Sequence, residues 1–438
     1  YAFLAPGFAL ARPSPFGAAV FSAFVAGLPA ALAAWGVRRC GAPRLAVAAA
    51  LVTLVLPLTI ESARNFLLDQ PVTLVAGLAA IAWLAAAQRP GWWRFALFAA
   101  LAAFAALVKG NGLLVALIPP IEIALSRRWA LLRDLRLWAA GAAALLVIVP
   151  WYLVSFRISA GGFNYAPGLD YAWEALVYNC AAILANIGWV GVLLAVIGAV
   201  AGFREAAARL ALAVIVATLV CQSAIPVALA DRYVLPLLPW CVMLAALGVR
   251  FLWERLRILA VALGIGALVV PAMAFANLAP KPDIGAPAIA DAMVRSPGIW
   301  MVDGRAGGEG AIIAAAAYAD AGKRRLWVAR ASQWLSTSDF MGRDYRLSVH
   351  SPEEAAGVLG RLGARGVVVI REKMRPAYPH SVILLRAMTP PRFAVAQRPF
   401  PRGAGVTNVA RRVAPVEAHP ELLSDGAGSR NFQMMGKF

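Results

Sequence analysis

The first 278 residues form a series of apolar stretches, each close to the length of about 20 residues that spans the hydrocarbon core of a bilayer. Polar or charged residues separate the stretches. The fifth stretch is the weakest, because Pro119, Pro120 and Glu122 interrupt it. The pattern predicts a polytopic all-α membrane domain with about ten transmembrane helices. The predicted spans are residues 16–36, 43–60, 71–87, 92–108, 111–126, 136–156, 185–203, 207–229, 233–250 and 257–278.

From residue 279 onward the pattern becomes that of a small, water-exposed α/β domain. Short β-type runs are bounded by Gly, Asp or Arg, and helical segments lie between them. The predicted strands are 299–302, 326–329 and 366–370, and the predicted helices are 309–321 and 352–363. The second helix has a clear start, with Ser351 as N-cap and Pro352 in the first position. This order predicts a Rossmann-like sheet within 279–400, and the Gly-, Pro- and Arg-rich segment 401–438 is predicted to be a flexible tail.

A glycine-rich segment follows the first predicted strand and opens a predicted helix. It contains Gly304, Gly307, Gly308 and Gly310, and this position invites comparison with the dinucleotide-binding pattern GxGxxG. The spacing does not match that pattern, and an exported domain would rarely meet NAD. We therefore interpret the segment as a turn.

Composition agrees with a membrane protein. Of the 438 residues, 61% are hydrophobic and 14% are charged, and the mean hydropathy is +0.72. Soluble domains are about 45–50% apolar and about a quarter charged. These values exclude a disordered chain, a collagen-like fibre and a small disulfide scaffold. The four cysteines all precede residue 279 and match no metal-binding spacing, so we predict that they are small packing residues.

Residues 1–278 carry +10 of the net charge of +19, and most of that is explained by the orientation of the helices; the outer domain supplies the other +9, so nucleic acid is not needed to explain the charge. If the first predicted span runs from outside to inside, the inner loops hold most of the basic residues, as the positive-inside rule requires. The inner residues are Arg38, Arg39, Arg44, Arg89, Arg94, Arg127, Arg128, Arg133, Arg136, Arg204, Arg209, Arg250, Arg255 and Arg257; the outer ones are Arg12, Arg64, Lys109, Arg157 and Arg232. This places the domain after residue 278 outside. Because the chain starts at Tyr1 with its N-terminus outside, we also expect a further helix upstream.

Polar residues on the outer side gather at the membrane–water boundary, where charges beside apolar spans usually mark a functional site or an interface. They are Glu61, Arg64 and Asp69 before the third span, Lys109 after the fourth, Trp151 and Tyr152 at the end of the sixth, Asp170 in the loop that follows, and Arg232 and Tyr233 at the ninth. Each residue alone can be explained as a helix cap, a snorkelling cation or an interfacial aromatic. That explanation is weaker for Asp69, which stands at the entrance of a span. It is also weaker for Lys109, because Gly110 and Gly112 would let a ligand approach the backbone.

Two or more cations beside two or more carboxylates at headgroup level suit a lipid-borne phosphate. Charge-assisted hydrogen bonds to a phosphate strengthen as negative charge develops on a leaving group. A nearby carboxylate could deprotonate an acceptor hydroxyl or amine. The residue types therefore favour transfer from a lipid-phosphate-linked donor, although a flippase or transporter could carry the same residues.

The motifs in these segments resemble those of glycosyltransferase family 39, whose members have the GT-C fold. The four motifs, in chain order, are Ala63–Pro71, Leu107–Gly110, Pro150–Tyr152 and Arg232–Pro239. The family includes dolichyl-phosphate-mannose protein mannosyltransferases and the bacterial aminoarabinose transferase that acts on lipid A. The resemblance covers about residues 10–250.

This resemblance implies an integral-membrane enzyme that moves a sugar from a polyprenyl-phosphate donor to a lipid, protein or glycan acceptor on the periplasmic face. It implies a catalytic role for Asp69, donor-phosphate contacts from Lys109, Arg232, Tyr233 and Arg64, and acceptor or loop contacts from Glu61, Trp151, Tyr152 and Asp170. The family's first outer loop bears an acidic motif that looks like the general base. This chain begins at Tyr1, after the expected position of that motif, so we expect the base to lie upstream in a longer protein.

Two other functions fit parts of the sequence. A catalytically inactive membrane scaffold that presents the outer domain to a partner is favoured by the missing base and opposed by the retained charges. A flippase or transporter of lipid-linked sugars would show charges buried mid-span, or repeated halves with broken helices, and only Glu122 hints at this. A divalent cation is left open as a cofactor; with no His before residue 279, it would need oxygen ligands such as Asp69.

Overall fold

The computed structural model of the protein describes residues 15–65, 67–160, 165–278, 281–321, 323, 325–338, 344–373, 375–413 and 418–420, apart from the side chains of residues 15, 156–160 and 306. The chain forms two compact units that divide after Leu278. Each unit is described below by itself.

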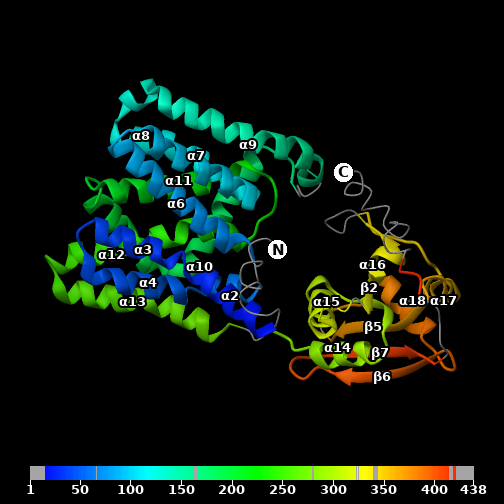
Figure 1. Ribbon diagram of the computed structural model, residues 1–438. Helices are drawn as coiled ribbons and strands as arrows, with labels where there is room; N and C mark the ends of the chain where they lie inside the picture. The colour runs from blue at the N-terminus through cyan, green and yellow to red at the C-terminus, as the bar shows by residue number, and fades with distance from the viewer. Residues whose placement is uncertain are drawn as a thin grey trace. The chain divides into compact units, whose positions relative to one another are not determined.

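The first unit is helical, as its apolar stretches predict (Figure 1). Its α-helices are α2 (Pro15–Gly27), α3 (Ala30–Arg39), α4 (Ala46–Val55), α5 (Pro57–Arg64), α6 (Asp69–Gln88), α7 (Trp92–Val108), α8 (Ile118–Ser126), α9 (Leu135–Ala160), α10 (Leu169–Ala201), α11 (Ala206–Ala224), α12 (Leu238–Trp253) and α13 (Arg257–Ala276). Short 3-10 helices connect some of them: η1 (Pro43–Leu45), η2 (Gly110–Leu117), η3 (Trp129–Arg133) and η4 (Asp231–Leu237).

The described helices correspond to the predicted spans, with differences in length. Seven are long and apolar enough to cross a membrane, and an eighth span forms if α4 and α5, bent by 54° at their junction, are counted together. The bend falls just before Pro57, which opens α5 with Leu56 in extended conformation. The predicted fourth and fifth spans are the shorter apolar helices Trp92–Val108 and Gly110–Ser126.

Close packing of α10 against α12 fixes the position of the segment η4, which leads directly into α12. A Cβ atom at Gly198 would lie 1.8 Å from the carbonyl oxygen of Leu244, and one at Gly248 would lie 2.1 Å from that of Leu194. Only glycine lets two helix backbones approach this closely. The helix α10 also bends at Gly188, whose φ of 70° interrupts the helical geometry.

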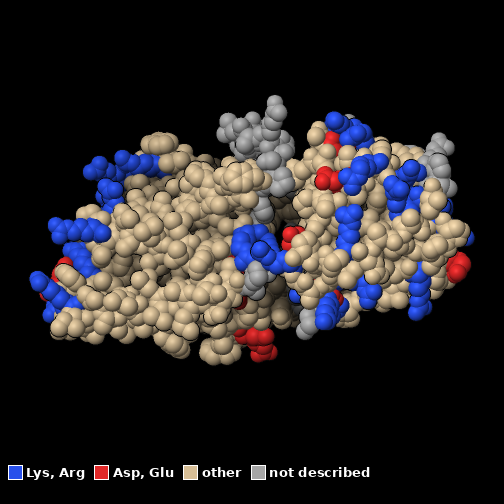
Figure 2. All heavy atoms as spheres, turned by 90° about the horizontal axis from the view of Figure 1, so that it is seen from below, with Lys and Arg blue, Asp and Glu red and all other residues tan. Residues whose placement is uncertain are grey.

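Lys and Arg side chains gather at one end of the helical unit (Figure 2, left). Arg39 ends α3, Arg94 stands in the first turn of α7, and Arg257 opens α13. The C-terminus of α7 lies at the opposite end of that helix from Arg94. The N-terminus of α6 lies beside this C-terminus, because Asp69 of α6 contacts Lys109. Arg12 and the side chain of Arg157 lie outside the described residues.

The second unit contains a five-stranded mixed sheet with helices on both faces (Figure 1). The strand order is β2-β1-β5-β7-β6; the first three strands are parallel, and β7 and β6 are antiparallel. Its elements are α14 (Ala286–Val294), β1 (Gly298–Asp303), α15 (Ala306–Asp320), β2 (Leu326–Arg330), α16 (Ala331–Trp334), β3 (Ser336–Thr337), β4 (Arg346–Leu347), α17 (Pro352–Arg361), β5 (Ala364–Glu372), α18 (Pro379–Ala387), β6 (Phe393–Pro399) and β7 (Gly405–Arg412). Helices α14 and α15 pack on one face of the sheet, and α17 and α18 pack on the other.

The three predicted strands and two predicted helices of this unit are confirmed. Ser351 is the N-cap of α17, and its hydroxyl accepts a hydrogen bond from the amide of Glu354. The prediction of a flexible tail from residue 401 is wrong for residues 405–412. They form β7, which pairs with both β5 and β6. The composition of this segment looks irregular, but an antiparallel partner on each side satisfies the hydrogen-bonding groups of its backbone. Residues 421–438 lie outside the described part of the chain.

Candidate functional site

Asp69 lies at the start of α6 and is almost completely buried. The helix N-terminus favours a carboxylate there, and Pro71 is tolerated because the amides of the first turn have no intrahelical acceptor. The Asp69 side chain is 1% exposed, and its Oδ1 accepts a 2.5 Å hydrogen bond from Nζ of Lys109. A carboxylate this deeply buried is stable only with a partner, so the two residues form one structural unit.

Lys109 lies where α7 ends and the chain turns into η2. Its backbone is extended, which releases the lysine from the helix. Gly112 lets η2 fold back onto α7, since a Cβ atom there would lie 2.1 Å from the carbonyl oxygen of Ala105. The prediction that Gly112 opens the backbone to a ligand is therefore wrong: its open side is filled by α7. At Gly110 the nearest neighbour of such a Cβ would be Tyr152 Oη at 3.6 Å, an ordinary contact distance.

Arg232 and Tyr233 reach the same place from η4, which contacts α6. Pro236 lies inside this segment, where its missing amide donor interrupts regular helical hydrogen bonding, and Pro239 lies in the first turn of α12, where such a donor would have no intrahelical acceptor. Nζ of Lys109 lies 5.1 Å from the centroid of the Tyr233 ring, and Cζ of Arg232 lies 5.5 Å from it. Two cations thus share one buried aromatic ring, an arrangement that stabilises each cation through the ring quadrupole.

The charges of this cluster leave hydrogen-bond donors unused. The cluster holds one buried carboxylate, Asp69, and two cations, Lys109 and Arg232, and among the described residues only Lys109 is paired with that carboxylate. The Arg232 Nε atom is buried and has no hydrogen-bond partner among the described residues. Asn111, two residues after Lys109, is also buried, and neither of its amide atoms has a partner in that part of the chain. Buried unpaired donors are costly, and an anionic ligand would satisfy them.

The other predicted site residues lie at varying distances from this cluster. The Tyr152 hydroxyl donates a 3.1 Å hydrogen bond to the carbonyl oxygen of Ala106, on the last turns of α7. Glu61, Trp151 and Asp170 are exposed, and in the described structure their side chains make no hydrogen bond or ion pair with the cluster. Arg64 is partly buried in the last turn of α5. Asp170 is not in a loop as predicted, because α10 already begins at Leu169.

Sequence reasoning missed a tyrosine that holds the segment bearing Arg232. Tyr178 Oη donates a 2.6 Å hydrogen bond to Oδ1 of Asp231, the first residue of η4. Tyr171, two helical turns earlier on α10, donates to the carbonyl oxygen of Ile225 at 3.0 Å. The seven-residue spacing places both on one helix face, but this signal is visible only once the helix is known to start well before residue 185.

Glu122 is buried in α8, and neither carboxylate oxygen has a partner among the described residues. Within the described part of the chain, no three His, Cys, Asp or Glu side chains lie together in a group that could hold a metal ion.

The apolar helices and this cluster at their ends define a polytopic membrane protein. Residues 1–153 match the model of the family described as dolichyl-phosphate-mannose-protein mannosyltransferase. No curated protein matches the chain by sequence.

Among solved structures, the chain is similar to ArnT from Cupriavidus metallidurans in the apo state, with 16% identity, a TM-score of 0.59, and coverage of 93% of this chain and 86% of that one. It is also similar to the same protein bound to undecaprenyl phosphate, with 15% identity, a TM-score of 0.55, and coverage of 95% and 88%. The predicted resemblance to family 39 and the predicted GT-C fold are therefore confirmed.

Proposed function

We propose that this protein transfers a sugar from a polyprenyl-phosphate donor to an acceptor hydroxyl or amine at the outer face of the membrane. The observation that carries the proposal is the buried Nε of Arg232, which has no partner among the described residues and lies beside Lys109 on the Tyr233 ring. The undecaprenyl phosphate bound to the similar ArnT supplies a matching class of ligand.

In this proposal the acceptor oxygen or nitrogen attacks the anomeric carbon of the sugar. The bond from that carbon to the phosphate oxygen breaks, the electron pair leaves with the polyprenyl phosphate, and the proton that the acceptor loses passes to water. Arg232 and Lys109 stabilise the negative charge that develops on this leaving group. Asp69 contributes by holding Lys109 in place, because its Oδ1 is already engaged by that lysine.

The donor site can be tested without knowing the sugar. Purified protein in nanodiscs should bind undecaprenyl phosphate much more tightly than undecaprenol, which lacks the phosphate. Arg232→Gln should weaken the binding of undecaprenyl phosphate about 10-fold to 100-fold, because a charge-assisted hydrogen bond contributes about 1.5–3 kcal/mol. Arg38→Gln, which removes an exposed cation at the end of α3, is the matched control. Equal affinity for the two lipids would overturn the assignment.

We further propose that the second unit is periplasmic and that the protein resides in a bacterial inner membrane. The support is the collection of arginines at the opposite end of the helical unit from the cluster. Alkaline phosphatase fused after Leu278 should be active in cells, whereas a fusion after Arg128 should be inactive. The reverse pattern of phosphatase activity would show that the topology is inverted and would overturn this proposal.

A flippase for lipid-linked sugars is the second candidate, favoured by the buried, unpaired Glu122 and by the bent helix pair α4–α5. Protein reconstituted in vesicles distinguishes the two functions. Movement of a labelled polyprenyl-phosphate sugar between leaflets without release of polyprenyl phosphate would favour the flippase, and Glu122→Gln should then stop that movement.

A further inference from the structure

A polar cavity of about 530 Å³ lies within the second unit, at the carboxyl ends of β1 and β5. The helix that follows β1, α15, packs on one face of the sheet, and the helix that follows β5, α18, packs on the other. Chain connections that leave neighbouring parallel strands toward opposite faces create a crevice at the strand ends, where α/β domains bind ligands. Position alone thus makes this cavity a candidate binding site.

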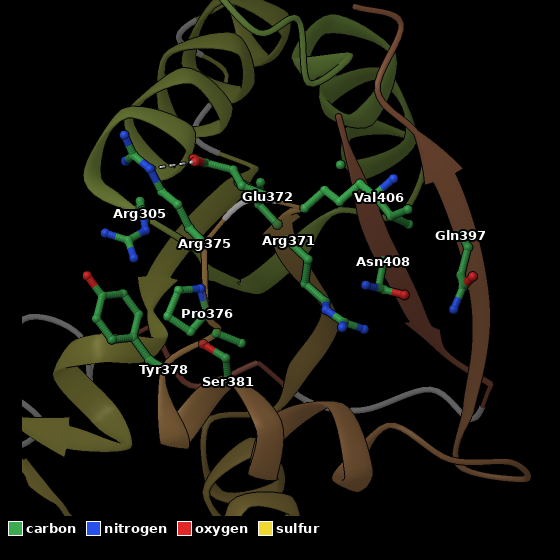
Figure 3. A pocket seen from close by; sticks show the side chains of 15 residues that line it. Arg305, Arg371, Glu372, Arg375, Pro376, Tyr378, Ser381, Gln397, Val406 and Asn408 are labelled. Atoms are coloured by element: carbon green, nitrogen blue, oxygen red, sulfur yellow. Dashed lines mark ion pairs between the residues drawn. The ribbon is translucent and has the colours of Figure 1, made fainter. Parts of the chain in front are cut away.

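Strand register places three polar side chains on the same face of the sheet at one side of the cavity. Asn408 of β7 pairs with Val369 of β5 and with Gln397 of β6. Arg371 lies two residues beyond Val369, so it points to the same face. Figure 3 shows Arg371, Asn408 and Gln397 on this side, with Ser381 of α18 nearby.

The opposite side of the cavity is built on a chain of contacts that starts at the buried end of β1. Asp303, which is completely buried, binds Nε2 of His380 at 3.0 Å. The His380 ring stacks on Tyr378 with centroids 5.4 Å apart, and the Arg305 guanidinium lies 5.5 Å from the Tyr378 centroid. Arg305 is thereby held at the cavity and also precedes the N-terminus of α15, where free amides and the helix dipole favour an anion.

The cavity is strongly cationic, and several of its donors are unused. Arg305, Arg371, Lys373 and Arg375 line it, and Glu372 is the one acidic residue among the described residues of its lining. Glu372 is paired with Arg375. Within the described part of the chain, the side chains of Arg371 and Lys373 have no hydrogen bond or ion pair. The Nδ2 atom of Asn408, a residue only 2% exposed, also has no partner there.

We propose that this cavity binds a phosphomonoester carried on a polar body the size of a sugar. Arg371, Lys373 and Arg305 would pair with the phosphate oxygens, and the Asn408 amide would donate to the ligand at the buried side. The volume falls within the range of about 300–1,000 Å³ typical of small-molecule sites, and it exceeds what one phosphate would fill. The site is separate from the cluster around Asp69 and does not depend on the transfer reaction proposed above.

Calorimetric titration of the full chain in nanodiscs tests this proposal with defined probes. Glucose 1-phosphate should bind and glucose should not. Arg371→Gln and Asn408→Asp should each weaken glucose 1-phosphate about ten-fold or more, because the first removes a cation and the second replaces an unpaired donor with a carboxylate. Arg386→Gln, on an exposed position of α18 outside the cavity, should leave the affinity unchanged.

Two further arms identify the source of the phosphate and separate the two sites. Water-soluble dihexanoyl phosphatidic acid carries the same phosphate group on a lipid. If this lipid binds more weakly than glucose 1-phosphate, the result supports a saccharide ligand. If it binds more tightly, the proposal of a sugar-sized polar ligand is overturned. Arg232→Gln should not change the binding of glucose 1-phosphate, even if it abolishes binding of undecaprenyl phosphate. Equal binding of glucose and glucose 1-phosphate, or equal losses in Arg371→Gln and Arg386→Gln, would overturn the proposal.

Discussion

The pair formed by Asp69 and Lys109 can be separated into a structural and a chemical contribution. Lys109→Met removes the cation but keeps a long, apolar side chain. Asp69 would then be a carboxylate with 1% exposure and no cation within reach of its Oδ1. We expect this variant to be both unstable and inactive, whereas the double variant Asp69→Asn/Lys109→Met should be stable and still inactive.

The expected magnitudes follow from the burial of the two partners. Removing one partner of a buried ion pair costs about 3–5 kcal/mol, because the remaining charge is uncompensated. Lys109 keeps 25% of its side chain exposed, so Asp69→Asn alone should cost less, about 1–3 kcal/mol. Replacing both partners removes the buried charges together and should bring stability back to within about 1 kcal/mol. Loss of a cation that stabilises the leaving phosphate should slow transfer about 10²- to 10³-fold.

Thermal unfolding in detergent measures the first contribution, and release of polyprenyl phosphate from a labelled lipid-linked sugar measures the second. Arg38→Gln serves as the control for loss of a cation elsewhere. Recovery of transfer in the double variant would refute the reasoning, since it would show that the pair only supports the fold. Normal stability of Lys109→Met would refute the structural part, because the buried carboxylate would then have another partner.

Three further predictions test the packing, the capping and the electrostatics of the fold. Gly198→Ala should destabilise the helical unit by about 3 kcal/mol or more in thermal melts, because its Cβ would lie 1.8 Å from a carbonyl oxygen of α12; Gly141→Ala, with open space around it, should be neutral or stabilising. Ser351→Ala should lower the stability of the second unit by about 1 kcal/mol in denaturant titrations, and Ser351→Asp should not, because Asp also caps a helix. Burial raises the pKa of Glu309, against the opposing effect of Arg330. The unfolded chain therefore loses this proton first as pH rises, so the free energy of unfolding decreases over the pH range between the ordinary glutamate pKa and the raised one. Glu309→Gln should flatten this decrease in thermal melts taken between about pH 4 and pH 8. An unchanged slope would contradict the prediction.

Local patterns predicted much of the architecture. Apolar stretches of membrane-spanning length and the arginines between them predicted the helices, because the cost of burying charge in lipid acts on each segment separately. Likewise, strands β1, β2 and β5 are continuous apolar runs, as strands covered on both faces must be. The strands β6 and β7 were not predicted, because their formation depends on pairing with β5 and with each other.

By itself the sequence determined which residues could serve a lipid-phosphate site: Asp69, Lys109, Arg232 and Tyr233 stand at helix ends that one topology places on one side of a membrane. The tertiary structure alone decided which of them meet. Lys109 contacts Asp69 because α7 ends beside the start of α6, and Tyr233 joins them because close glycine packing fixes the helix α12 that follows η4. The fold also decided that Gly304 and Arg305, directly after β1, line a cationic cavity, because its other lining residues come from segments distant in sequence. Hydropathy is a property of each segment and can be recognised along the sequence. The partner of a buried charge depends on packing between segments that are distant in the sequence, so only the tertiary structure determines it.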